Sequence, residues 1–541
     1  MKWWGKTAKI SIDIRDESIP KEWLLEPEHL PSKEQHSVLD VPEGSGSLTA
    51  EEIEMTNADV DSLLEAYQTH KWTVRQVTTA FLKKAVVINQ LTNFVTEFLP
   101  EEALSQADSL DAHLASTNTL KGSLHGIPTS LAEPIPLGNH ITHSGIVSRI
   151  TTCDPAPTED APLIHNLKRA GAVIHLRTNV NQGLIGTGCE NNVMGRTLNP
   201  HDRRLSPGGP CGGEGVSVGA GCTVLGVGLD VGIPAAFGGC YGFKPTAGRV
   251  PSEWAIGAED GEGGGARCVV GPLARSADGL QAWMKAVLDE KADMSPASAP
   301  WRSVPELGSF TVGVMWDDGI VKPHPPVRRA LRTAVDKIRA AGVQVVEWVP
   351  HDRARGYAML APLCFPDGGK RYLDEFDKSG ERPVTSVVQA LDDQTKESCG
   401  VSVAGLEDPQ TLAQERESYQ REHDALMAER GVDFILGPAY VGAGALHDDA
   451  KYPLYTSIWN ILDLPSVVVP SGLRSDKVVD VKDETYVPKS NIDKETWGAY
   501  DPESVDRFPI ALQLAGKRAE DEQVLSAAGV LDKIFKEGSQ P

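Results

Sequence analysis

The chain has 541 residues, of which 52 are Lys or Arg and 75 are Asp or Glu, so its formal net charge is −23. This charge excludes nucleic acid and anionic membranes as expected partners, because both attract positively charged surfaces. No stretch approaches the roughly 18 apolar residues of a membrane span, and the first residues carry no apolar signal segment. We therefore expect a cytoplasmic protein whose partner is a small molecule.

The eight cysteines are scattered along the chain, without a CxxC pair and without histidines at zinc-binding spacing. Scattered cysteines of this kind are typical of reduced, buried thiols. We therefore expect neither a metal site nor any other cofactor.

In chain order, residues 1–48 are rich in Pro, Glu, Lys and Ser and predict an extended N-terminal arm, while residues 49–541 predict one large domain. Two capping boxes, Thr49 to Glu52 and Thr73 to Gln76, predict the starts of helices. Residues 122–145 are rich in Gly and Pro and predict a loop region.

The second half of the chain alternates between strand and helix patterns. The sequence predicts a strand from Thr311 to Met315, a helix from Pro326 to Ala341 and a strand from Val343 to Val349. This alternation is typical of an α/β fold, in which helices flank both faces of a mixed or parallel sheet. Residues 257–265 are acidic and glycine-rich, which predicts a surface loop.

The most informative stretch runs from Asn199 to Thr246, where glycines are densely packed. Glycines allow left-handed turns and a close approach of the backbone to a ligand. An enzyme built in this way usually presents a nucleophile between such loops, yet the sequence has no serine from Val218 to Pro251.

The order of motifs along nearly the whole chain resembles that of the amidase signature family, and most closely its fungal acetamidase-type branch. The motifs that carry this resemblance are LHGIP at 124–128, ENNVMGRTLNP at 190–200, SPGG at 206–209, GGEG at 212–215, PAAF at 234–237, YGFKPT at 241–246, VVGPLARS at 269–276, YTSIWNILDLPSVVVP at 455–470 and LQLAGKRAEDEQVL at 512–525. The resemblance implies a single large domain with a mixed, twisted central sheet. Members of this family often form homodimers, but the sequence does not determine whether this chain forms a homodimer.

Members of this family hydrolyse amides with a triad of two serines and a lysine. At the family's lysine this chain has Ala132, and at its relay serine it has Pro210. The turn that follows Asp230 is shorter than the family's and contains no nucleophilic serine. These departures predict that serine-based hydrolysis is lost. Because proline tolerates a cis peptide bond, we also expect the Gly209–Pro210 bond to be cis.

Other groups could supply chemistry in the place of the triad. His140 and His143 are candidate acid–base groups, since histidine titrates near pH 7. Glu133 is a candidate proton shuttle and Cys211 a candidate thiolate nucleophile. For all four a structural role is the alternative. The retained pocket wall is expected to include His125, Glu190, Ser206, Gly208, Gly209, Asp230, Val231 and Gly232.

From the sequence we therefore expect an amidase fold repurposed for a non-hydrolytic reaction, such as cyclisation, isomerisation or elimination, on a small organic substrate of the secondary-metabolite kind in the former amidase pocket. Two alternatives stay open. One is a protein that binds a small ligand or a partner without turnover. The other is residual amide or ester hydrolysis that uses Cys211. The loss of the lysine and the shorter turn also predict an enlarged pocket.

Overall fold

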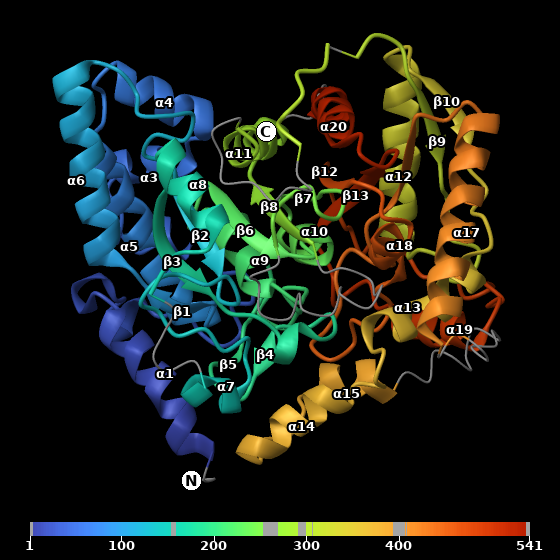
Figure 1. Cartoon of the computed structure of the whole chain (residues 1–541), viewed down its shortest axis with the longest axis horizontal. Coiled ribbons are helices and arrows are strands. Elements are labelled where there is room, and N and C mark those ends of the chain that lie inside the picture. The colour runs from blue at the N-terminus through green and yellow to red at the C-terminus, as the bar shows by residue number, and fades with distance from the viewer. Residues whose placement is uncertain are drawn as a thin grey trace.

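The computed structural model describes residues 4–152, 158–252, 269–289, 299–305, 307–392, 406 and 408–536. A mixed sheet of 11 strands lies at the centre of this structure. The order across the sheet is β1-β3-β2-β6-β8-β7-β12-β13-β11-β9-β10, with helices on both sides (Figure 1). This arrangement confirms the predicted α/β fold. The strands are β1 (Val95–Phe98), β2 (Pro128–Ala132), β3 (Val173–Thr178), β6 (Leu225–Leu229), β7 (Tyr241–Lys244), β8 (Val270–Ala274), β9 (Thr311–Val314), β10 (Gln344–Glu347), β11 (Phe434–Pro438), β12 (Ser466–Arg474) and β13 (Pro509–Ala515), and a separate hairpin pairs β4 (Glu190–Asn191) with β5 (Gly195–Arg196).

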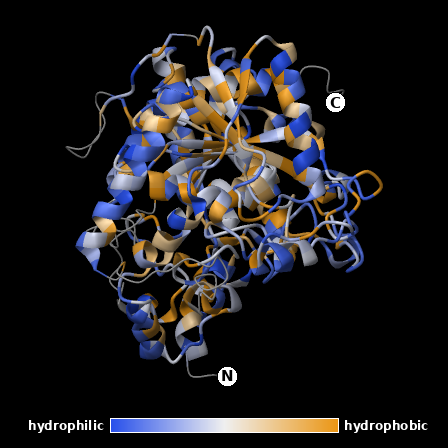
Figure 2. Ribbon diagram, turned by 90° about the vertical axis from the view of Figure 1, so that its right-hand side faces the viewer, coloured by the Kyte–Doolittle hydropathy of each residue, from blue (hydrophilic) through white to orange (hydrophobic). Residues whose placement is uncertain are grey.

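The sheet is mixed: groups of parallel strands lie on either side of an antiparallel middle, and the edge strand β1 pairs antiparallel with β3. Strand β2 pairs in parallel with β3 and β6, and β9 pairs in parallel with β10 and β11. Between them, β8, β7, β12 and β13 are joined by antiparallel ladders. Apolar residues concentrate in these central strands, while polar residues predominate on the outer helices (Figure 2).

The helices of the described residues have the following bounds: α1 (Trp4–Ser18), α2 (Val41–Gly44), α3 (Ala50–Asn57), α4 (Val60–Gln68), α5 (Val74–Thr92), α6 (Pro100–Thr117), α7 (Val147–Thr152), α8 (Pro162–Ala170), α9 (Gly212–Gly219), α10 (Gly232–Gly238), α11 (Ala277–Val287), α12 (Pro325–Ala340), α13 (Arg353–Cys364), α14 (Lys370–Ser379), α15 (Thr385–Asp392), α17 (Pro409–Glu429), α18 (Leu454–Leu462), α19 (Asn491–Gly498) and α20 (Asp521–Lys536). Three short 3₁₀ helices are η1 (Lys21–Trp23), η2 (Pro27–His29) and η3 (Gln182–Leu184). Within this part of the chain, no helix combines the length and the apolar character that crossing a bilayer requires.

Both predicted capping boxes are confirmed. The Thr49 hydroxyl accepts a hydrogen bond from the backbone N–H of Glu52, and the Glu52 carboxylate accepts one from the backbone N–H of Thr49. Thr73 and Gln76 form the same reciprocal pair at the start of α5. Each box satisfies backbone donors that lack a partner within the helix, which fixes where α3 and α5 begin.

Two predictions about local structure are wrong. The region 122–145 is not loop throughout, because residues 128–132 form β2 between β3 and β6. The arm 1–48 is not extended throughout, because α1 is a helix whose Ala8 packs with Val147 and Ile150. The predicted loop 257–265 lies outside the described residues. The domain boundary at residue 49 stays a prediction.

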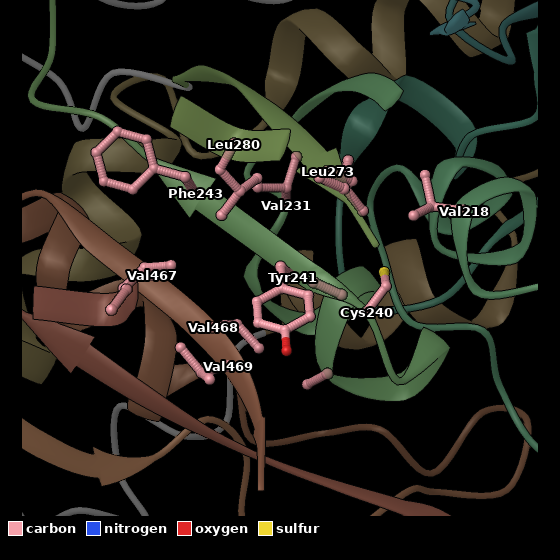
Figure 3. Close-up of a cluster of buried hydrophobic side chains, with 14 of the residues drawn as sticks. Val218, Val231, Cys240, Tyr241, Phe243, Leu273, Leu280, Val467, Val468 and Val469 are labelled. Carbon is pink, nitrogen blue, oxygen red and sulfur yellow. The ribbon is translucent and has the colours of Figure 1, made fainter. Parts of the chain in front are cut away.

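The middle of the sheet presents two different faces. Because side chains alternate along a strand, Tyr241 and Phe243 of β7 lie on one face and Gly242 and Lys244 on the other. Tyr241 and Phe243 join Val467 and neighbouring apolar residues in the buried core (Figure 3). The opposite face is therefore the one on which a site can form.

Candidate functional site

A cavity of about 810 Å³ lies against this second face of the sheet. The ladder places Lys244 opposite Ser466, and Gly242 opposite Val468, which in turn lies opposite Gln513. All five residues line the cavity, so β7, β12 and β13 form its floor. The volume falls within the range of roughly 300–1,000 Å³ that is usual for small-molecule sites.

Loops and helices from distant parts of the sequence complete the cavity. Its walls include the loop at Gly209–Pro210, the start of α10 and one face of α18. Apolar side chains of the wall are Ile185, Ile233, Leu360, Ala361, Phe365 and Val441, and exposed residues at its rim are Leu446, Asp449, Lys451, Glu495 and Asp501. The site is therefore an apolar pocket with polar groups on its floor and rim.

Asp230 and Lys244 are ionisable residues of the cavity lining. Asp230 follows β6 and has a left-handed backbone, with φ of 48°. Its carboxylate accepts a hydrogen bond of 2.8 Å from the Asn460 side chain on α18. Lys244 ends β7 with only 5% of its surface exposed. Burial lowers the pKa of its ammonium, and nearby carboxylates, with Asp463 first, oppose that shift.

The glycine-rich loop keeps close contact with the rest of the site. The Gly209–Pro210 bond is cis, as the sequence predicts. A β-carbon at Gly209 would meet the backbone carbonyl of Gly188, so no larger residue fits there without a shift of the backbone. Gly209, Pro210, Asp230 and Gly232 line the cavity.

Cys211 is placed away from the cavity. Its side chain is fully buried in the core, and its sulfur accepts a hydrogen bond of 3.2 Å from the backbone N–H of Leu229. Burial raises the pKa of this thiol well above its ordinary value. A buried thiol with a raised pKa stays protonated, whereas a thiolate is needed for attack. This geometry favours the structural role that the sequence left open for Cys211.

The candidates Glu133, His140 and His143 also lie outside the cavity lining. The Glu133 carboxylate accepts hydrogen bonds from the backbone N–H groups of His143 and Ser144, at 2.6 Å and 2.8 Å. Burial lowers the pKa of His143. Both residues therefore fix the fold of the loop after β2.

His140 takes part in an ion-pair network at the edge of the sheet. Its ring nitrogens lie 2.9 Å from the Glu97 carboxylate and 3.1 Å from the Glu102 carboxylate. Burial opposes protonation, but these two carboxylates outweigh it and raise the pKa of His140 to about 9. A histidine with this pKa is almost fully protonated at neutral pH, so it serves poorly as a base.

The remaining expected wall residues, His125, Glu190, Ser206, Gly208 and Val231, are not part of the cavity lining and have other contacts. His125 accepts a hydrogen bond from the N–H of Lys121, and burial lowers its pKa to about 4. Ser206 accepts one from the N–H of Gly208. Glu190 forms an ion pair with Arg196, and Val231 is buried at the start of α10.

Lys244 is not among the site residues predicted from the sequence, although it lies in the motif YGFKPT. The available signal was a lysine that ends a buried apolar strand, a position where a charged side chain is rare without a partner. The face on which it lies depends on pairing with β12, more than 200 positions later in the chain. That pairing could not be derived from local pattern.

Comparisons with known proteins show the family to which this fold belongs. The family model described as Amidase matches residues 76–525. The chain belongs to the amidase signature family. It is 35% identical to a putative amidase of Schizosaccharomyces pombe, covering 98% of each chain, and 33% identical to an acetamidase of Emericella nidulans, covering 96% of each. A solved fatty acid amide hydrolase superposes with a TM-score of 0.90 at 31% identity, covering 98% of this chain and 95% of that one.

These relatives correct the functional expectation. A repurposed enzyme for cyclisation, isomerisation or elimination is wrong as the main interpretation, because proteins similar over nearly the full length are named amidases and acetamidases. That expectation gave most weight to three altered positions. The fold around them instead matches that of a solved fatty acid amide hydrolase over 98% of this chain.

Proposed function

We propose that this chain hydrolyses the C–N bond of a carboxamide bound in the cavity on the sheet floor. The observation that carries the proposal is the position of the cavity, which is walled by Gly209–Pro210, Asp230 and Gly232 of the family's glycine-rich motifs. Nearly full-length similarity to amidases supports hydrolysis as the reaction class. A volume of about 810 Å³ suits an amide much larger than acetamide.

We propose further that the family's triad is absent. Ala132 stands at the position of the lysine, and its methyl group is fully buried in the core. Pro210 stands at the relay serine and has no hydroxyl. The turn after Asp230 offers only Val231, Gly232 and Ile233 before Pro234. Hydrolysis without these groups proceeds by direct attack of water, with no acyl-enzyme.

Asp230 is the group that we assign to water activation. Its carboxylate takes a proton from a water molecule as the water oxygen bonds to the carbonyl carbon. The C–N bond then breaks as the leaving nitrogen takes this proton back from Asp230, which releases the carboxylic acid and ammonia or an amine and restores the Asp230 carboxylate. Because carboxylates are weak bases at neutral pH, we expect slow turnover, below that of relatives that keep a serine nucleophile.

Release of ammonia or amine from a panel of aliphatic and aryl-substituted amides tests this function. We expect turnover by the full-length protein and a loss of at least ten-fold in kcat for Asp230→Asn, in line with the usual effect of removing a general base. The matched control is Asp108→Asn on the exposed surface of α6, which should behave as wild type. Equal turnover by wild type and Asp230→Asn would remove Asp230 from the mechanism.

A second candidate function is binding of a small amide without turnover. The residues at the three triad positions favour it, because none of them carries a nucleophile or a base. The same panel separates the two functions: calorimetric binding of an amide with no released amine over a day would select binding alone. Failure of a serine-directed fluorophosphonate to label the protein is expected under both.

A further inference from the structure

The geometry points to Lys244 as the hydrogen-bond donor that holds the carbonyl oxygen of a neutral carboxamide on the floor of the cavity. The inference rests on the proposed function for the class of ligand. It adds a residue that neither the triad nor the water mechanism uses. It also predicts that the cavity binds neutral amides in preference to carboxylates of the same size.

The first observation is the position of the ammonium. Lys244 lies at the end of β7 on the cavity face, opposite Ser466 of β12, and both residues line the cavity. Lys244 is only 5% exposed and Ser466 only 8%. A lysine this deep in a cleft cannot reach bulk water in the way that surface lysines do. Its charged end therefore needs partners within the site.

The second observation is that those partners are incomplete. The Lys244 ammonium donates one hydrogen bond of 3.0 Å, to the backbone carbonyl of Pro245. Among the described residues it forms no ion pair with a carboxylate. An ammonium carries three N–H groups, so the site leaves donors for a ligand. Donors in a buried, poorly hydrated position bind an oxygen acceptor more strongly than they would in water.

The third observation concerns charge around Lys244. Asp463, Asp230 and Asp521 act on its ammonium from a distance and favour its protonated form, whereas Arg416 opposes it. Asp463 accepts a hydrogen bond from the N–H of Ala247, and Asp521 accepts from Thr246, so these carboxylates are held by the backbone beyond β7. Three carboxylates thus already act on the cation. A carboxylate ligand would meet repulsion, while a neutral amide oxygen would not.

The fourth observation is the close packing of the start of α10 against β7, beside Lys244. Gly242 shares the face of Lys244, and a β-carbon there would lie 2.6 Å from the β-carbon of Ala235 and 3.0 Å from the carbonyl oxygen of Val231. The absence of a side chain at Gly242 therefore lets the start of α10 pack directly against β7. Asp230 and Lys244 line the same cavity, so a carbonyl group held by Lys244 shares that cavity with the carboxylate assigned to water activation.

Calorimetry on the full-length protein with 4-phenylbutyramide and 4-phenylbutyrate tests this inference. The two probes share shape and differ in charge. We expect wild type to bind the amide at least ten-fold more tightly than the acid. Lys244→Met should weaken amide binding about ten-fold or more, the usual effect of losing a hydrogen bond to a charged donor. The control Lys477→Met, on an exposed lysine paired with Glu503, should bind both probes as wild type does.

Each outcome of these binding measurements supports or overturns the role of Lys244. An unchanged Kd for Lys244→Met with folded protein, or equal binding of acid and amide by wild type, would overturn the assignment. Lys244→Arg keeps the charge and should retain the preference for the amide; if neither variant folds, the wild-type ratio decides. A wild type that binds the amide but releases no ammonia would refute the proposed hydrolysis alone and leave Lys244 as the binding group.

Discussion

Replacement of His140 by glutamine should destabilise the fold in a pH-dependent way and leave the cavity intact. His140 lies between the carboxylates of Glu97 and Glu102, and Arg177 contacts Glu97 at 3.4 Å. The His140 side chain is only 10% exposed. Glutamine keeps hydrogen-bonding capacity but removes the positive charge that these carboxylates surround.

The expected loss in the free energy of unfolding follows from the raised pKa of His140. Its value of about 9 lies above the ordinary 6.5, and each unit is equivalent to about 1.4 kcal/mol, so the upper bound is about 3 kcal/mol. Glu102 is 59% exposed, and because solvent screens its interaction we expect about 2 kcal/mol. Because the pKa of His140 is raised in the folded state, its ion pairs stabilise the fold fully below pH 6.5. The contribution is lost as the pH rises through about 9.

Urea unfolding at pH 6 and pH 9.5, followed by tryptophan fluorescence, measures the effect. We expect His140→Gln to unfold at lower urea than wild type at pH 6, with the difference largely gone at pH 9.5. His29→Gln, at an exposed position, is the control and should match wild type at both pH values. A difference in urea midpoint that stays constant across this pH range would refute the ion-pair explanation. A loss of amide binding by His140→Gln would show that His140 does contribute to the site.

Three further predictions concern buried and cavity-lining groups. Cys211→Ala should retain amide binding and turnover, and iodoacetamide followed by peptide mass spectrometry should modify the half-buried, cavity-lining Cys364 before Cys211; rapid labelling of Cys211 would contradict its burial. Glu214→Gln should become increasingly more stable than wild type as the pH rises from 5 to 8, because burial raises the pKa of Glu214 from 4.5 to about 8, and over this range the carboxyl is ionised in the unfolded chain but must stay protonated in the folded one; equal urea midpoints at pH 8 would oppose this. Gly209→Ala should lower the melting temperature and weaken amide binding, since its β-carbon would collide with the Gly188 carbonyl; wild-type melting and binding would show that the loop can shift.

Local signals predicted much of the helical structure. Capping boxes at Thr49 and Thr73 satisfy backbone donors within a few residues, so the sequence alone determines where α3 and α5 begin. The strand β2 was missed because its five residues carry little pattern of their own. It becomes a strand through pairing with β3 and β6, which lie roughly 40 and 100 positions further along.

The site was predictable only in part. Glycine density and the motif order indicated the wall at Gly209, Pro210, Asp230 and Gly232, all of which line the cavity. Nearness in sequence suggested Glu133, His140 and His143 as a second group of site residues, but their side chains are engaged by Glu97, Glu102 and backbone N–H groups. The floor at Lys244 and Ser466 depends on a long-range strand register that no local pattern specifies.

The most direct test of hydrolysis without a serine nucleophile is mass spectrometry of an amide incubated with the full-length protein in ¹⁸O-labelled water. We predict slow formation of the carboxylic acid with one heavy oxygen, and an intact protein mass that stays free of an acyl adduct throughout turnover. Quantitative recovery of the amide, or accumulation of an acylated protein, would contradict the account.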